Sequence, residues 1–245
     1  PALWLIKSSN GGVTWTHVTG ANAPPGDGFT SAVQRINDKL YFFTTSDSLG
    51  TGNYALYAFD LVTETWDSPT AALPTAGIFE FAISNSGQWS NGLIVYPDGD
   101  VGIFYVKSGG AATYREWNGA TWGAEVSLPG DSCANMIIDP GQELIHVFTY
   151  DGFTKSDPVI YSTVAHGGAV TSTIDTIPAS VGNSDGVGHC SIQDDLIFVP
   201  RDDYADFANA VWVANLSDGQ FSKELLPVPT DEQNFIQSVA ISNAG

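Results

Sequence analysis

The chain has 245 residues, of which 43% are hydrophobic and 12% aromatic, which is enough apolar material for one large domain or two small ones. Charged residues make up only 14%, beside 26 Gly and 13 Pro, a composition typical of many short strands joined by turns. The net charge of −19 argues against nucleic acid as a partner, because phosphate binding needs a cationic surface. No run of roughly 18 apolar residues occurs, so we expect no membrane insertion.

Two cysteines, Cys133 and Cys190, are too few for a disulfide framework. They either form one disulfide or remain two small buried thiols, and we favour the thiols. The sequence begins at Pro1 with neither an initiator Met nor a signal peptide. We therefore expect a processed product, or part of a longer chain or a larger assembly.

One N-terminal segment, from Ser8 to Trp15, reads S-x-N-x-G-x-T-W. Its chemistry predicts a short turn with a tryptophan anchor: Asn10 bonds to local backbone, Gly12 takes a positive φ, and a strand begins at Thr14. The segment resembles the Asp-box hairpin of sialidase-like (BNR-repeat) β-propellers. In that family such hairpins are structural and lie away from the channel mouth.

A repeat of about fifty residues follows this hairpin along the chain. Four degenerate counterparts of the hairpin occupy residues 56–66, 113–122, 159–172 and 211–221. A proline follows each of the five hairpins, at Pro25, Pro74, Pro129, Pro178 and Pro227, so successive prolines are 49, 55, 49 and 49 residues apart. A fresh pair of apolar alternating strands then begins, as at 135–139 with 144–150. The unit is thus four antiparallel strands.

Four-stranded units repeated radially predict an all-β, five-bladed β-propeller, whereas a β-sandwich has no reason to repeat at a fixed period. We place the blades at about 26–73, 76–128, 130–177 and 183–228, with a closing blade from 1–20 plus 233–245 that lacks one strand. The stretch 78–91 is irregular and holds either an innermost strand or an insertion. Tryptophans at equivalent strand positions should form the inter-blade core: these are Trp4, Trp15, Trp66, Trp122 and Trp212.

The resemblance implies that ligands bind where the loops entering the innermost strands meet the loops between second and third strands. Every loop of the first set carries an acid: Asp27, Glu80, Asp131, Asp185, and Asp231 with Glu232. Acids suit turns in any case, but a ring of carboxylates could also do acid–base chemistry. By analogy with five-bladed arabinanase-type hydrolases, a glycoside hydrolase would use Glu80, Asp131 and Asp185. The three arginines do not occupy equivalent blade positions, so we do not expect a sialidase.

Aromatic and acidic mouth loops favour glycan binding, because aromatic rings stack on sugar faces and carboxylates accept hydroxyl hydrogen bonds. The candidate ligand-binding residues are Trp89, Asp151, Phe153, His189, Arg201, Asp202, Asp203 and Tyr204, with Phe207 beside them. We expect a non-catalytic recognition or adhesion module on an extracellular or virion surface, with a glycan or a host or cell-surface receptor as partner. The alternatives are a glycoside hydrolase and a structural assembly or decoration domain.

No cofactor is expected. Ca²⁺ is the cation that the Asp-rich stretches 151–157 and 202–206 would suit, although EF-hand spacing is absent. His189 is interpreted as a polar channel-lining residue. The other histidines, His17, His146 and His166, are too scattered in the repeat to join it in a zinc cluster.

Overall fold

The structure is a computed structural model of the chain. It describes residues 5–24, 30–45, 54–68, 73, 78–81, 92–107, 111–139, 141, 144–152, 154, 156–171, 173–179, 186–188, 190–201 and 210–225. All strands and helices assigned in this part of the chain are β-strands, as predicted for an all-β fold. Over the same residues, no helix is long and apolar enough to cross a membrane.

Four antiparallel sheets account for most of the described strands. Sheet 1 contains β3 (Thr30–Ile36), β4 (Lys39–Thr45), β5 (Tyr54–Asp60) and β6 (Thr65–Trp66). Sheet 2 contains β7 (Ile78–Phe81), β8 (Leu93–Val95), β9 (Val101–Lys107), β10 (Ala111–Trp117) and β11 (Val126–Ser127). Sheet 3 contains β12 (Ser132–Asp139), β13 (Leu144–Tyr150), β14 (Val159–Ala165) and β15 (Asp175–Ile177). Sheet 4 contains β16 (Ser191–Gln193), β17 (Leu196–Pro200), β18 (Ala210–Asn215) and β19 (Phe221–Leu225).

Sheet 2 explains the irregular stretch 78–91. Both β7 and β8 pair antiparallel with β9, β7 at the Tyr105–Lys107 end and β8 at the Val101–Ile103 end. The two short strands therefore share the innermost position of the sheet. Of the two alternatives for this stretch, β7 is thus part of an innermost strand, and residues 82–91 lie outside the described part of the chain.

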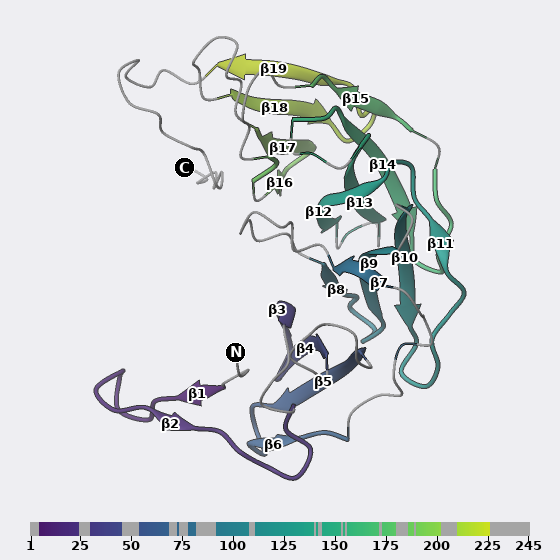
Figure 1. The fold of residues 1–245 in the computed structure, drawn as a ribbon. Coiled ribbons are helices and arrows are strands. Elements are labelled where there is room, and N and C mark those ends of the chain that lie inside the picture. The colour runs from purple at the N-terminus through teal and green to yellow at the C-terminus, as the bar shows by residue number, and fades with distance from the viewer. Residues whose placement is uncertain are drawn as a thin grey trace.

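The sheets fan out as an arc (Figure 1). Strands β3, β8, β12 and β16 face its open centre, and β6, β11, β15 and β19 lie on its rim. Each pair of neighbouring sheets encloses its own apolar cluster. Side chains on a strand alternate between its two faces, so one strand contributes to two clusters. On β9, Ile103 and Tyr105 pack toward sheet 1, while Phe104 and Val106 pack toward sheet 3. Sheets 3 and 4 enclose a third cluster in the same way. Sheets 2 and 3 are thus buried on both faces by their neighbours.

The N-terminal hairpin pairs only with itself among the described strands, through β1 (Ile6–Lys7) and β2 (Thr16–His17). Its turn behaves as the local chemistry predicts, since Gly12 has φ +90° and Asn10 Oδ1 accepts a 2.9 Å hydrogen bond from the Thr14 amide. The expectation that Trp15 is core is wrong: this residue is 58% exposed. Its indole folds back onto its own turn and donates to the Gly12 carbonyl at 3.0 Å, because no described strand covers it.

The other tryptophans divide differently. Trp66 is buried beside Phe42 and Phe59 on the face of sheet 1 that meets Val18, while Trp122 and Trp212 are partly buried against the inter-sheet clusters. Trp4 lies outside the described residues. The core therefore contains three of the predicted anchors.

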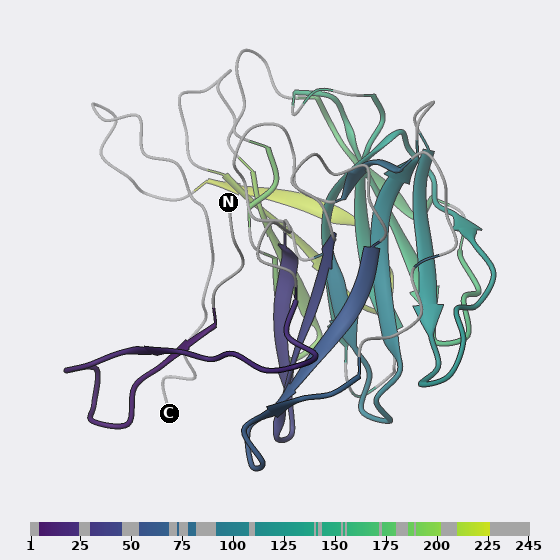
Figure 2. The same ribbon diagram turned by 60° about the horizontal axis from the view of Figure 1, so that its bottom comes forward.

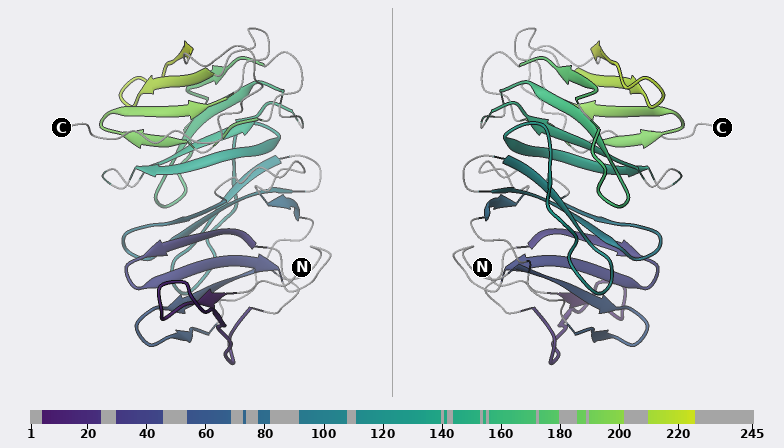
Figure 3. Two further views of the ribbon diagram at one scale, coloured as in Figure 1. Left: turned by 90° about the vertical axis from the view of Figure 1, so that its left-hand side faces the viewer. Right: turned by 90° about the vertical axis from the view of Figure 1, so that its right-hand side faces the viewer.

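The strand connections separate into two ends of the arc (Figures 2 and 3). Turns between first and second strands, and between third and fourth strands, lie at one end, which we call the hairpin end. The second strands end and the third strands begin at the opposite end, which we call the loop end, and the described connection from β11 to β12 lies there too. The segment 233–245, which should complete the closing blade, lies outside the described residues, so the fifth blade and ring closure stay predictions.

Cys190 is a free thiol, as we favoured. Burial raises the pKa of this thiol well above its ordinary value, and Sγ lies 3.8 Å from the Gly188 carbonyl oxygen. The Cys133 side chain is outside the described part of the structure.

Candidate functional site

At the loop end, Arg201 connects segments of sheets 3 and 4. It follows β17 and is 1% exposed. Its Nη1 donates to the carbonyls of Ile177 and Pro178, at 3.4 and 2.9 Å, and its Nη2 donates to the Asp157 carbonyl at 2.5 Å. Arg201 is a predicted ligand contact. Its guanidinium links the end of β17 to the β13–β14 loop, through Asp157, and to the segment that follows β15, through Pro178.

The loop between β13 and β14 is held in shape by polar groups of its own and by one side chain of β12. The Asp157 carboxylate accepts a 2.7 Å hydrogen bond from the Thr154 amide, and Ser132 Oγ donates to the Gly152 carbonyl at 2.8 Å. Gly152 has φ +139°, and a Cβ there would lie 2.7 Å from the Asp157 carboxyl carbon. Asp151 precedes this tight point, and its side chain is exposed.

The hydrolase candidates are only partly described. Asp131 directly precedes β12 and is half-buried, with its amide bonded to the Tyr150 carbonyl at 2.9 Å. Glu80 lies on β7 in register with Val106, but its side chain is outside the described part. Asp185 also lies outside it.

The remaining ligand-binding candidates lie outside the residues that the structure describes. They are Trp89, Phe153, His189, Asp202, Asp203 and Tyr204, together with Phe207. Their assignment stays a prediction.

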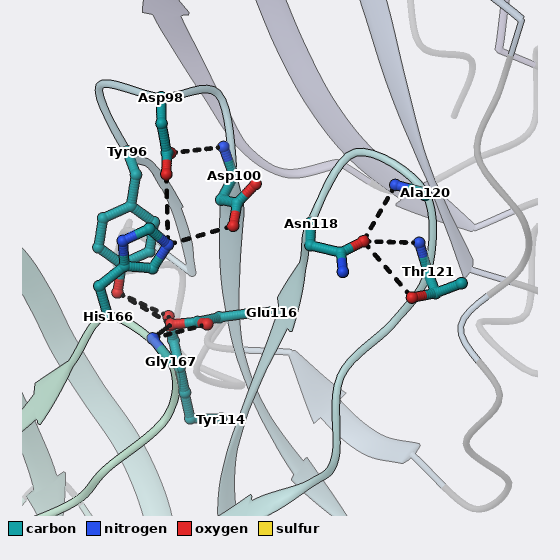
Figure 4. Close-up of polar contacts among 10 residues, drawn as sticks. All are labelled: Tyr96, Asp98, Asp100, Tyr114, Glu116, Asn118, Ala120, Thr121, His166 and Gly167. Carbon is teal, nitrogen blue, oxygen red and sulfur yellow. Dashed lines mark hydrogen bonds and ion pairs between the residues drawn. The ribbon is translucent and has the colours of Figure 1, made fainter.

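At the hairpin end, the structure forms a cluster that the sequence analysis missed (Figure 4). Asp98 and Asp100 lie in the turn from β8 to β9, and His166 lies in the turn after β14 of the neighbouring sheet. His166 Nε2 is 3.1 Å from Asp100 Oδ2 and 3.7 Å from Asp98 Oδ2. One ligand atom from each residue lies within 4.8 Å of the others, so the three can share a cation.

Two buried tyrosines, Tyr96 and Tyr114, lie against this cluster and are hydrogen-bonded to each other. The His166 ring stacks on Tyr96 with centroids 4.1 Å apart and an interplanar angle of 15°. Tyr96 Oη lies 2.9 Å from Tyr114 Oη, and Glu116 Oε1 accepts from Tyr114 at 2.7 Å and from Tyr96 at 3.2 Å. Burial raises the pKa of both tyrosines well above the ordinary value, so both stay neutral hydroxyls able to donate.

Glu116 also reaches across to sheet 3. Its Oε2 accepts a 3.0 Å hydrogen bond from the Gly167 amide, next to His166 (Figure 4). A single carboxylate thus binds two buried hydroxyls of its own sheet and the turn that carries the histidine. Sequence offered only the turn signal Asp98–Gly99–Asp100; nothing in it connected that turn with a histidine more than sixty residues away.

No protein-family model and no curated protein matches the chain. Solved structures do resemble it. The Dos1 propeller superposes with a TM-score of 0.54 at 12% identity, over 96% of this chain and 55% of that one. The β-propeller domain of the Trilobed protease from Pyrococcus furiosus, described with an open velcro topology, gives 0.50 at 9% identity, over 82% and 57%.

A third similar structure is an arginine-to-alanine triple mutant of AofleA from Arthrobotrys oligospora. It gives a TM-score of 0.50 at 15% identity, over 92% of this chain and 65% of that one. The chain therefore spans between 55% and 65% of the length of these three proteins. Together with the antiparallel four-stranded sheets, these similarities establish a β-propeller fold.

Proposed function

We propose that the chain is a non-catalytic recognition module that binds a glycan at its loop end, on an extracellular or virion-surface protein. One observation carries the proposal: the Arg201 guanidinium ties loop-end segments of sheets 3 and 4 together through three backbone carbonyls. Such an internal tie fixes the loops before a ligand arrives, which lowers the entropy cost of binding.

The residues beside this tie have the chemistry that sugars need. Asp151 is exposed at the start of the fixed loop, and Phe153 follows it in sequence by two positions. Asp202, Asp203 and Tyr204 directly follow Arg201 in the chain. A ligand at these two loops would meet carboxylates for its hydroxyls and aromatic rings for its apolar faces.

A glycan array with the purified chain tests the proposal, followed by titration of the best glycan. We expect selective binding, and Asp151→Ala should weaken it by roughly tenfold or more, the scale of a lost charge-assisted hydrogen bond. Asp38→Ala is the matched control, since Asp38 is an exposed acid in the turn between β3 and β4 at the hairpin end. It should leave the affinity unchanged.

Two results would contradict the proposal. A flat array would favour the structural assembly role. Hydrolysis of aryl-glycosides by the wild-type chain, abolished in Asp131→Asn, would instead show a glycosidase using a mouth carboxylate.

A further inference from the structure

We propose that Asp98, Asp100 and His166 form a binding site for a divalent transition-metal ion of the Zn²⁺ type, at the hairpin end between sheets 2 and 3. This site is separate from the glycan surface proposed above, because it lies at the opposite end of the sheets.

The distances fit a common metal ion. Zn²⁺ binds nitrogen and oxygen ligands at about 2.0–2.2 Å, so two ligand atoms of one tetrahedral ion lie about 3.3–3.6 Å apart. The separations of His166 Nε2 from Asp100 Oδ2 and Asp98 Oδ2, at 3.1 and 3.7 Å, lie on either side of that range, and the ligand atoms of the two aspartates lie within 4.8 Å of each other. Small side-chain shifts would therefore bring all three atoms onto one ion.

The ligand types select the kind of metal. Ca²⁺ and Mg²⁺ take oxygen ligands almost exclusively, whereas imidazole nitrogen with carboxylate oxygen suits Zn²⁺ and similar ions. The site also opens to solvent, since the side chains of Asp98 and His166 are 50% and 21% exposed. Three protein ligands would leave a coordination position for water or for an external group.

Asp98 and His166 are held in place before any ion binds. Asp98 Oδ1 accepts a 3.0 Å hydrogen bond from the Asp100 amide, which leaves its Oδ2 toward the histidine. Gly99, at φ +98°, provides the turn between them. Stacking on Tyr96 fixes the imidazole plane, as Figure 4 shows, and the hydrogen bond from the Gly167 amide to Glu116 fixes the turn that carries the histidine. Ligands oriented in this way bind metal more tightly than mobile ones.

Charge favours a cation as well. The site brings two acidic side chains against one imidazole, in a chain whose net charge is −19. The competing explanation is an ion pair between protonated His166 and the two aspartates, which would connect sheets 2 and 3 without any metal. Only the metal site predicts saturable binding that depends on the same three residues.

The test is calorimetric titration of ZnCl₂ into untagged, EDTA-treated protein at about pH 7.5, where an unperturbed imidazole is mostly neutral. We expect one equivalent of Zn²⁺ to bind, and excess CaCl₂ should not displace it. Asp98→Asn and His166→Gln should each weaken Zn²⁺ binding by at least about tenfold. His17→Gln, which removes an exposed histidine from β2, should bind as the wild type does.

Asp98→Asn is the decisive variant, because its amide oxygen can still accept from the Asp100 amide and keep the turn. A second measurement guards against misfolding: Zn²⁺ should raise the melting temperature of the wild type and not that of Asp98→Asn. Absence of saturable binding, or equal affinity in the wild type and Asp98→Asn, would overturn the metal site and leave the ion pair.

Discussion

At the scale of single residues, His146 shows how burial controls a titratable group. It lies on β13, is 1% exposed, and its Nδ1 is 2.7 Å from Tyr161 Oη. Its Nε2 is buried with no hydrogen-bond partner. Burial lowers the pKa of His146 to about 4, partly offset by the Asp139 carboxylate. The folded state therefore holds a neutral imidazole.

This pKa predicts a pH window for stability. The folded-state pKa of His146 lies below its unfolded value of about 6.5. The contribution of this residue to the free energy of unfolding is therefore fully present above pH 6.5 and is lost as the pH falls from there to about 4. The loss should amount to about 3 kcal/mol. The free energy of unfolding, measured by urea titration at several pH values in this window, should depend less steeply on pH for His146→Gln than for the wild type. An equal pH dependence in the two proteins would contradict the assignment.

At the scale of elements, β9 and β10 meet at a close approach that only glycine permits. On β9, Gly102 pairs with Glu116 of β10 and lies beneath the Tyr114 ring. A Cβ at Gly102 would lie 2.7 Å from Tyr114 Cε2 and 2.9 Å from Cζ. The Tyr114 ring thus packs directly on Gly102, in the space that a side chain would occupy. This position allows its hydroxyl to donate a hydrogen bond to Glu116.

Gly102→Ala should accordingly destabilise the chain by about 1–3 kcal/mol, the usual cost of overpacking a well-packed core. The added methyl would push the Tyr114 hydroxyl away from Glu116. Gly123→Ala is the control, because a Cβ there meets only an ordinary 3.5 Å contact with the Glu116 carbonyl. Free energies of unfolding from urea titration decide, and equal losses in both variants would refute the close approach.

At the scale of the whole molecule, an arc of apolar inter-sheet clusters carries a strongly acidic exterior. The chain has 27 acidic side chains against 8 Lys and Arg. Ion pairs such as Lys39 with Asp67 and Lys107 with Glu125 neutralise only a few of the acids. Self-repulsion of the remainder opposes the compact state.

Added salt should therefore stabilise the fold. Raising NaCl from about 10 to 200 mM shortens the Debye length from about 30 to 7 Å and screens the repulsion. We expect the melting temperature to rise with NaCl and to rise equally with KCl, which separates screening from a specific cation effect. A falling melting temperature would show that attractive surface pairs dominate instead.

Local chemistry and strand periodicity could be predicted from the sequence alone. Alternating apolar residues with turn signals at a regular period predict antiparallel four-stranded units, because side chains on a strand alternate between its faces. Asn10 and Gly12 act as their chemistry predicts, because a turn depends on its own few residues. The glycan assignment and most of its residues stay predictions.

The tertiary structure decided which residues meet across sheets. Trp15 has the repeat position of a core residue but is exposed, because burial depends on a neighbouring strand and not on the hairpin itself. Arg201, a predicted ligand contact, donates to backbone carbonyls of sheet 3 and its loops, which its position in the sequence does not indicate. Asp98 and His166 come together only because sheets 2 and 3 pack through one apolar cluster and align their turns. A repeat specifies each sheet, but contacts between sheets depend on packing that spacing along the chain does not encode.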